Sequence, residues 1–85
     1  MNKLENLKKK IIYRASYRGT KEMDLLLTSF VGKYIDILDE EYLFELENLL
    51  NLEDEIIYDY FYKGISNEKI IKNKINTLLK DFKIL

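Results

Sequence analysis

Residues 17–27, with the sequence YRGTKEMDLLL, mark the sharpest change of pattern in this chain of 85 residues. A basic segment precedes them, and an apolar repeat follows and continues to Leu38. At the join lies Gly19, which would cost about 1 kcal/mol inside a helix and more naturally ends one. Thr20 suits the N-cap of a following helix, and Glu22 suits its positive end. The stretch therefore predicts a corner between two helices.

The composition excludes several classes of protein. The chain has no proline, three glycines, no cysteine and no histidine. So few helix breakers favour an all-α fold over sandwiches and barrels, which need many turns. Without cysteine and histidine, a disulfide, a thiolate metal site and the commonest general base are all missing. We therefore expect no enzyme, no catalytic residues and no metal site.

Hydrophobicity gives an expectation about location. No apolar run approaches the roughly 20 residues that a membrane-spanning helix needs. The first five residues, MNKLE, are too polar for a secretory signal. We therefore expect a cytoplasmic protein that does not insert into the membrane.

Charge is distributed unevenly although the net charge is only −1. From Asp36 to Asp59 every charged residue is an acid, whereas both ends of the chain are mainly basic. Either the opposite signs attract one another within the fold, or the acidic middle faces a basic partner. Nucleic acid is not expected, because the acidic block would repel phosphate.

Helical spacing of apolar residues predicts a compact five-helix bundle in one small domain, residues 1–85, with residues 1–3 frayed. The first helix covers residues 3–16. The second begins after Thr20 and carries an apolar stripe as far as Leu38. Within it, Gly32 is interpreted as a place where a neighbouring helix approaches closely.

The later helices are predicted from caps and breaks. Asp39 suits the start of the third helix, and residues 51–54 interrupt the pattern before a short fourth helix. Gly64 is placed to end that helix, and either Ser66 or Asn67 is expected to cap the fifth. The expected core lies at helical spacing: Leu4, Leu7, Ile11, Ala15, Met23, Leu26, Leu27, Phe30, Val31, Tyr34, Leu38, Leu43, Leu46, Leu49, Leu50, Ile56, Ile57, Tyr60, Phe61, Ile71, Ile75, Leu78, Leu79 and Phe82.

Four aromatic residues crowd the predicted fourth helix: Tyr58, Tyr60, Phe61 and Tyr62. Adjacent helical residues project about 100° apart, so one face cannot bury all four. One or two should remain partly exposed. They either cover a thin core or form an aromatic contact patch for another protein.

Arg18 and Glu22 are four residues apart, which would allow a salt bridge on one continuous helix. Gly19 is expected to interrupt the helix between them. An arginine beside a glycine then offers a planar set of donors with nothing bulky to block a partner's backbone. We therefore expect Arg18 to face outward as a docking point.

The sequence resembles a known family at this point. Residues 18–22, RGTKE, match the R-G-x-x-E motif of the succinate dehydrogenase assembly factors, which comprise the SdhE type of bacteria and its mitochondrial relatives. The resemblance covers nearly the whole chain, including Arg14, the acidic run after Leu38 and the stop at Gly64. One departure is Tyr60, where many members carry a tryptophan.

The resemblance implies an assembly factor that binds the flavoprotein subunit of succinate dehydrogenase, with that of fumarate reductase as a second candidate. It promotes covalent attachment of FAD to a histidine of the partner, so this chain itself carries no covalent FAD. The implied partner-binding residues are Arg18, Gly19 and Glu22, bordered by Tyr17, Lys21 and Asp24. The alternative is a general helical interaction module or antitoxin-like adaptor that uses its acidic middle as the contact face.

Overall fold

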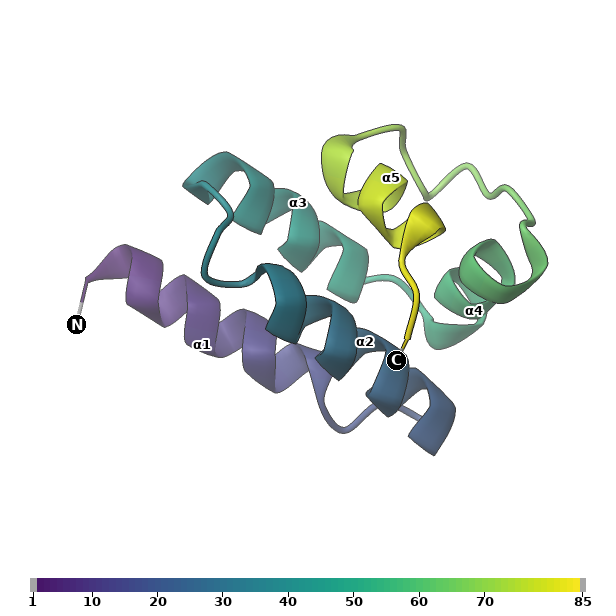
Figure 1. Ribbon diagram of the computed structural model, residues 1–85, viewed down its shortest axis with the longest axis horizontal. Helices are drawn as coiled ribbons and strands as arrows, with labels where there is room; N and C mark the ends of the chain where they lie inside the picture. Colours follow the sequence, from purple (N-terminus) through teal and green to yellow (C-terminus); the bar gives the residue numbers. More distant parts are fainter. Residues whose placement is uncertain (1, 85) are drawn as a thin grey trace.

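The computed structural model describes residues 2–84, and over that range it contains five helices and no strands (Figure 1). The helices are α1 (Lys3–Ala15), α2 (Lys21–Tyr34), α3 (Glu40–Leu50), α4 (Asp54–Lys63) and α5 (Lys74–Asp81). Figure 1 shows α1, α2 and α3 running in similar directions, with α5 beside α3 at the upper right and α4 at the right, beyond the C-terminal end of α3. The prediction of a small all-α, five-helix protein is confirmed.

The helix starts follow the expected capping chemistry in part. The Thr20 hydroxyl accepts a hydrogen bond from the Met23 amide at 3.2 Å, as predicted. Asp39 occupies the N-cap position of α3 but makes no side-chain cap hydrogen bond. Of the residues expected to be frayed, Met1 lies outside the described range. The Asn2 side chain accepts from the Glu5 amide at 2.8 Å and caps α1.

Two expectations about α2 are wrong. The helix ends at Tyr34 instead of Leu38, and a turn follows it. No neighbouring helix approaches Gly32, because a Cβ added there would meet no atom within 4 Å. Gly32 lies on the exposed side of α2.

The start of α5 was also predicted wrongly. Asn73 caps this helix by accepting from the Asn76 amide at 2.8 Å. The side chain of Asn67 instead accepts from the Lys69 amide at 2.8 Å in a short turn. Because the helix begins later than expected, Ile71 lies in the preceding loop and is 60% exposed. Several polar residues in this segment can cap a helix, and spacing alone did not distinguish them.

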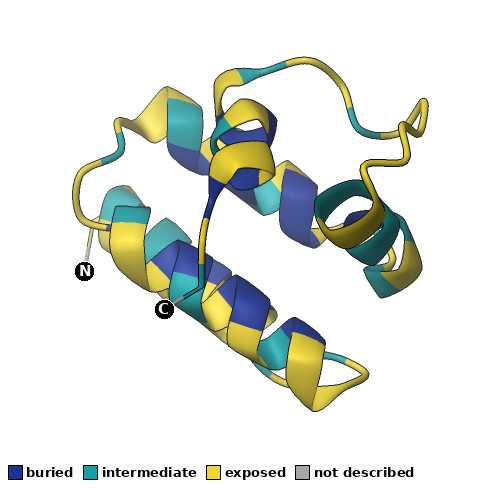
Figure 2. Cartoon of the chain, turned by 45° about the vertical axis from the view of Figure 1, so that its right-hand side comes forward, coloured by how far each residue is buried: buried dark blue, intermediate teal, exposed yellow. Residues whose placement is uncertain are grey.

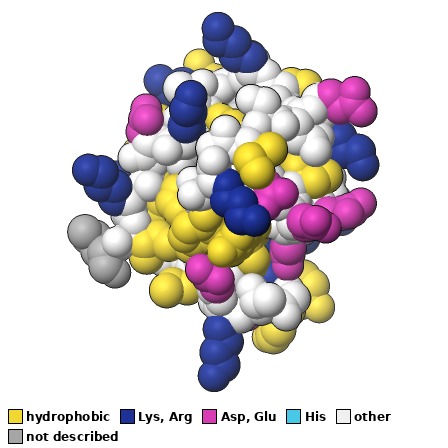
Figure 3. All heavy atoms as spheres, turned by 90° about the vertical axis from the view of Figure 1, so that its right-hand side faces the viewer, with side chains coloured by type: hydrophobic (Ala, Val, Ile, Leu, Met, Phe, Trp, Pro, Cys, Tyr) yellow, Lys and Arg dark blue, Asp and Glu magenta, His cyan; other side chains and the backbone are white. Residues whose placement is uncertain are grey.

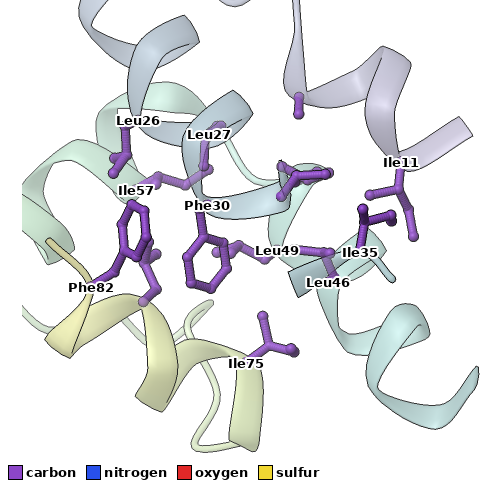
Figure 4. Packing of buried hydrophobic residues seen from close by; sticks show 14 of the residues in the cluster. Ile11, Leu26, Leu27, Phe30, Ile35, Leu46, Leu49, Ile57, Ile75 and Phe82 are labelled. Carbon is purple, nitrogen blue, oxygen red and sulfur yellow. The ribbon is translucent and has the colours of Figure 1, made fainter. Parts of the chain in front are cut away.

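The core joins all five helices (Figures 2 and 4). The ring of Phe30 lies 5.1 Å from that of Tyr34 and 5.2 Å from that of Phe82, both in edge-to-face geometry. The described residues buried as apolar core are Ile11, Ala15, Met23, Leu26, Leu27, Phe30, Val31, Ile35, Leu43, Leu46, Leu49, Leu50, Ile57, Ile75, Leu79 and Phe82.

Basic residues of α1 lie close to acids of α3 and of the turn after α2. Lys10 of α1 lies 2.9 Å from the Glu47 carboxylate of α3, and Lys8 lies 3.8 Å from Asp36. Part of the acidic middle is therefore matched within the fold. Over residues 2–84, no helix has the length and apolar character to cross a bilayer.

Candidate functional site

Arg18 lies where the end of α1, the end of α3 and the start of α4 meet. Its Nε donates to Oδ1 of Asp54 at 2.7 Å, and its Nη2 lies 2.7 Å from the same oxygen. The backbone carbonyls that accept from its Nη atoms belong to Arg14, Leu50 and Leu52, at 3.0, 3.0 and 3.1 Å. Only 11% of the side chain is exposed. The prediction that Arg18 faces outward is therefore wrong, because its donors are used within its own chain.

Asp54 explains why a glycine follows this arginine. Its second carboxylate oxygen accepts from the Gly19 amide at 2.8 Å. A Cβ at Gly19 would lie 3.2 Å from that oxygen, which is tighter than ordinary contact. Gly19 thus permits the close approach of this chain's own carboxylate. Asp54 is also the first residue of α4, where the helix dipole favours a negative charge.

The corner, residues 16–20, is also held from its other sides. Asp24 is half-buried and accepts a hydrogen bond from the backbone amide of Arg18. Arg14 donates to the side-chain oxygen of Asn51, beyond the end of α3. Asp24, expected at the border of a docking patch, therefore turns toward the chain.

Four of the predicted site residues face solvent: Gly19 at the corner, and three residues with exposed side chains. Lys21 and Glu22 lie exposed in the first turn of α2. Tyr17 is 82% exposed, and its ring centroid lies 5.6 Å from that of Tyr13. Its backbone has φ 58°, a left-handed conformation that costs about 1–2 kcal/mol for residues other than glycine. The corner thus holds a large aromatic side chain in solvent despite an unfavourable backbone conformation.

A hollow of about 360 Å³, the α2–α4 hollow, opens beside these residues. Its lining includes Glu22, Glu55, Tyr58, Asp59 and Lys63. Figure 3, which views the right-hand side of Figure 1, shows hydrophobic side chains gathered on this face with acidic side chains beside them.

Tyr62 belongs to the same face of the molecule. Burial raises the pKa of its hydroxyl, and the negative charge of Glu22 raises this pKa further. The ring centroid of Tyr62 lies 4.7 Å from that of Tyr58 and 4.7 Å from that of Phe61. Tyr62 is 39% exposed, which agrees with the prediction that some aromatic residues of α4 remain partly exposed.

Tyr60 is half-buried and packs against the core. Its hydroxyl donates to the backbone carbonyl of Asn76 at 3.0 Å and so ties α4 to α5. Burial, and to a smaller extent the charge of Asp81, raises the pKa of the Tyr60 hydroxyl. Tyrosine at this position therefore fills a packing role and adds a hydrogen bond.

Sequence reasoning missed Asp54 as the partner of Arg18 and Gly19. An acid at the start of a helix is already explained by the helix dipole, so nothing in the pattern marked it for a second role. The separation of 36 residues between Arg18 and Asp54 also lies outside any local spacing rule.

This arrangement can fix the relative positions of the helices and expose a surface to another protein. Within residues 2–84, no group of three or more His, Cys, Asp or Glu side chains is placed to hold a metal ion. The fold and the site thus define a small all-helical protein with a rigid, internally bonded corner beside an exposed aromatic and acidic face.

Comparison with known proteins narrows this class to one family. The family model described as the flavinator of succinate dehydrogenase, Sdh5, matches residues 9–83. The chain belongs to this family. By name the family is one of assembly factors and not of enzymes.

The relatives agree with this placement. A mitochondrial succinate dehydrogenase assembly factor 2 of Saccharomyces cerevisiae is 38% identical over 66 residues, which are 78% of this chain and 39% of that protein. Its counterpart in Komagataella phaffii is 32% identical over 85 residues, 99% of this chain and 42% of that protein.

A bacterial relative matches as well. The FAD assembly factor SdhE of Acetobacter pasteurianus is 33% identical over 55 residues, 65% of this chain and 50% of that protein. The chain spans about two-fifths of the length of the two yeast relatives.

Proposed function

We propose that this chain binds the flavoprotein subunit of succinate dehydrogenase and promotes covalent attachment of FAD to that subunit. The observation that carries the proposal is the R-G-x-x-E corner itself, in a chain that belongs to a family described as the flavinator of succinate dehydrogenase. The flavoprotein subunit of fumarate reductase is a second candidate partner. The FAD becomes attached to the partner, so this chain carries none covalently. A bacterial cytoplasmic location is part of the same proposal.

The proposal gives different roles to the motif residues, and the geometry supports this division. Arg18 and Gly19 are bonded to Asp54 and set the positions of the two helices that meet at the corner. Tyr17, Lys21 and Glu22 are exposed, which supports their role in contacting the partner. The contact surface is thus built on a rigid support, which suits a protein that holds a partner in a reactive geometry.

Flavin labelling tests this proposal. The flavoprotein subunit is co-expressed with wild type, Glu22→Gln or Lys21→Gln, and its covalent flavin is measured by in-gel fluorescence after denaturation. We expect Glu22→Gln to reduce labelling, because it removes an exposed charge without disturbing the corner. The matched control is Glu41→Gln, which alters an exposed acid of α3. Full labelling with a folded Glu22→Gln variant would argue against this surface, and labelling that does not depend on the chain would reject the function.

A further inference from the structure

The rest of the chain covers α4 only partly, and six of its ten residues are half-buried. Of its ten residues, only Ile57 is buried. Tyr58 and Phe61 are half-buried, and Tyr62 is exposed. Their rings contact one another through Tyr62 and form an aromatic surface beside the α2–α4 hollow. Exposed tyrosines of this kind are enriched where proteins meet.

The charges around this aromatic surface favour a positively charged partner. Glu22, Glu55 and Asp59 line the hollow, and Asp54 is engaged by Arg18. Lys63 is the single basic residue among those that line it. Within residues 2–84, the ion pairs include none to Glu22 or Glu55. An incoming segment would therefore meet an excess of negative charge.

Lys63 already illustrates the kind of group that fits here. Its ammonium lies 5.8 Å from the centre of the Tyr58 ring and 3.6 Å from the Asp59 carboxylate. Both are weak contacts, because the Lys63 side chain is 58% exposed. An aromatic face with a carboxylate at its edge is the environment that an arginine favours, since guanidinium stacks on rings and pairs with carboxylates.

We propose that the α2–α4 hollow receives an arginine-bearing segment of the partner protein, with the guanidinium stacked on Tyr58 and paired with Glu55, in competition with Lys63. This inference rests on the proposed function for the identity of the partner, the flavoprotein subunit. It adds the chemistry of the contact and extends the surface from the corner onto α4. Lys63 then acts as an internal competitor that lowers the affinity.

The test measures the Kd of the purified flavoprotein subunit for four forms of the full chain: wild type, Lys63→Gln, Tyr58→Leu and Glu55→Gln. We expect Lys63→Gln to tighten binding about three- to tenfold, because it removes the competing cation. Tyr58→Leu and Glu55→Gln should weaken binding by a similar factor. The matched control is Lys80→Gln, which removes an exposed lysine of α5. Circular dichroism and thermal unfolding verify that each variant is folded.

The outcomes separate the two levels of the proposal. If wild type does not bind the flavoprotein subunit, both the proposed function and this inference are rejected. If wild type binds and Lys63→Gln leaves the Kd unchanged or weakens binding, the partner does not bring a cation to the hollow. The proposed function would then stand while this inference falls. Lys63→Gln is a conservative surface change, so its result does not depend on whether Tyr58→Leu folds.

Discussion

The guanidinium of Arg18 connects three helices through one carboxylate and three backbone carbonyls. Removing it takes the Arg18 donors away from those carbonyl oxygens and from Oδ1 of Asp54, which costs more than the net worth of the bonds. We expect Arg18→Met to lower the free energy of unfolding by about 2–4 kcal/mol. Arg18→Lys should recover only part of this loss, because an ammonium cannot reproduce the planar arrangement of donors.

Urea unfolding followed by circular dichroism measures this effect. The matched control is Lys21→Met, a neighbouring exposed cation whose loss should change stability by no more than about 0.5 kcal/mol. An Arg18→Met variant as stable as the control would show that the corner is not a structural joint. The result also decides how a loss of flavin labelling by an Arg18 variant is interpreted, because an unfolded factor cannot bind its partner.

Replacing Arg18 should lower stability, whereas replacing Tyr17 should raise stability and weaken binding. Its left-handed backbone, φ 58°, is better tolerated by asparagine. We expect Tyr17→Asn to raise the free energy of unfolding by up to about 1 kcal/mol and to weaken binding of the flavoprotein subunit. Tyr13→Asn, a change within α1 that also removes an exposed ring, should give no such gain in stability. A loss of stability in Tyr17→Asn would mean that the ring contributes more than the backbone strain costs.

The residue types at the corner were predictable, whereas their orientations were not. Gly19, Thr20 and the helix break between Arg18 and Glu22 follow from local conformational preference. Whether Arg18 faces outward depends on Asp54, which is distant in sequence and reaches the corner only through tertiary packing. The same reason explains why Asp24 was placed at the border of the patch when its carboxylate accepts from the Arg18 amide.

At the level of helices, predictions succeeded where apolar spacing and a cap coincide. Met23, Leu26 and Phe30 define the buried stripe of α2, and Gly64 ends α4 in a left-handed conformation, φ 68°. The prediction failed at α5, where Ser66, Asn67 and Asn73 all have side chains that can cap a helix. Tertiary contacts with α3 settle the start, since the Ile75 amide also donates to Glu45 at 3.2 Å.

The caps themselves can be compared by mutation. We expect Asn73→Ala to lower the free energy of unfolding by about 1 kcal/mol, because it removes the acceptor for the Asn76 amide at the start of α5. Asn67→Ala should have a smaller effect, since its side chain closes only a short turn in an exposed loop. Chemical unfolding of both variants measures the difference. A larger loss in Asn67→Ala would mean that the helix extends to residue 67 in solution.

Across the whole molecule, the acidic middle of the sequence divides into two groups. Asp36, Glu47 and Asp54 pair with basic residues from the first part of the chain. Glu55 lies beside the aromatic face of α4, as does Glu22 from outside this acidic block, and neither has an ion pair within residues 2–84. The first reading of the charge pattern, attraction within the fold, therefore holds for the paired acids, whereas a surface for a basic partner is our proposal for the others. Composition alone could not assign the acids to these groups.

The pairing of α1 with α3 gives a prediction for the fold as a whole. Lys10 is 54% exposed at its side chain, but Glu47 is only 15% exposed, so removing Lys10 leaves a largely buried carboxylate without its cation. We expect Lys10→Gln to lower the free energy of unfolding by about 1–2 kcal/mol at low salt. The stability advantage of wild type over Lys10→Gln should shrink between about 0.02 M and 0.5 M NaCl, because salt screens the partly exposed pair.

Lys3→Gln, in the exposed first turn of α1, serves as the control. The double change Lys10→Gln with Glu47→Gln should be more stable than Lys10→Gln alone. If the double variant is no more stable, the cost at Lys10 comes from lost packing of its alkyl chain and not from the uncompensated charge.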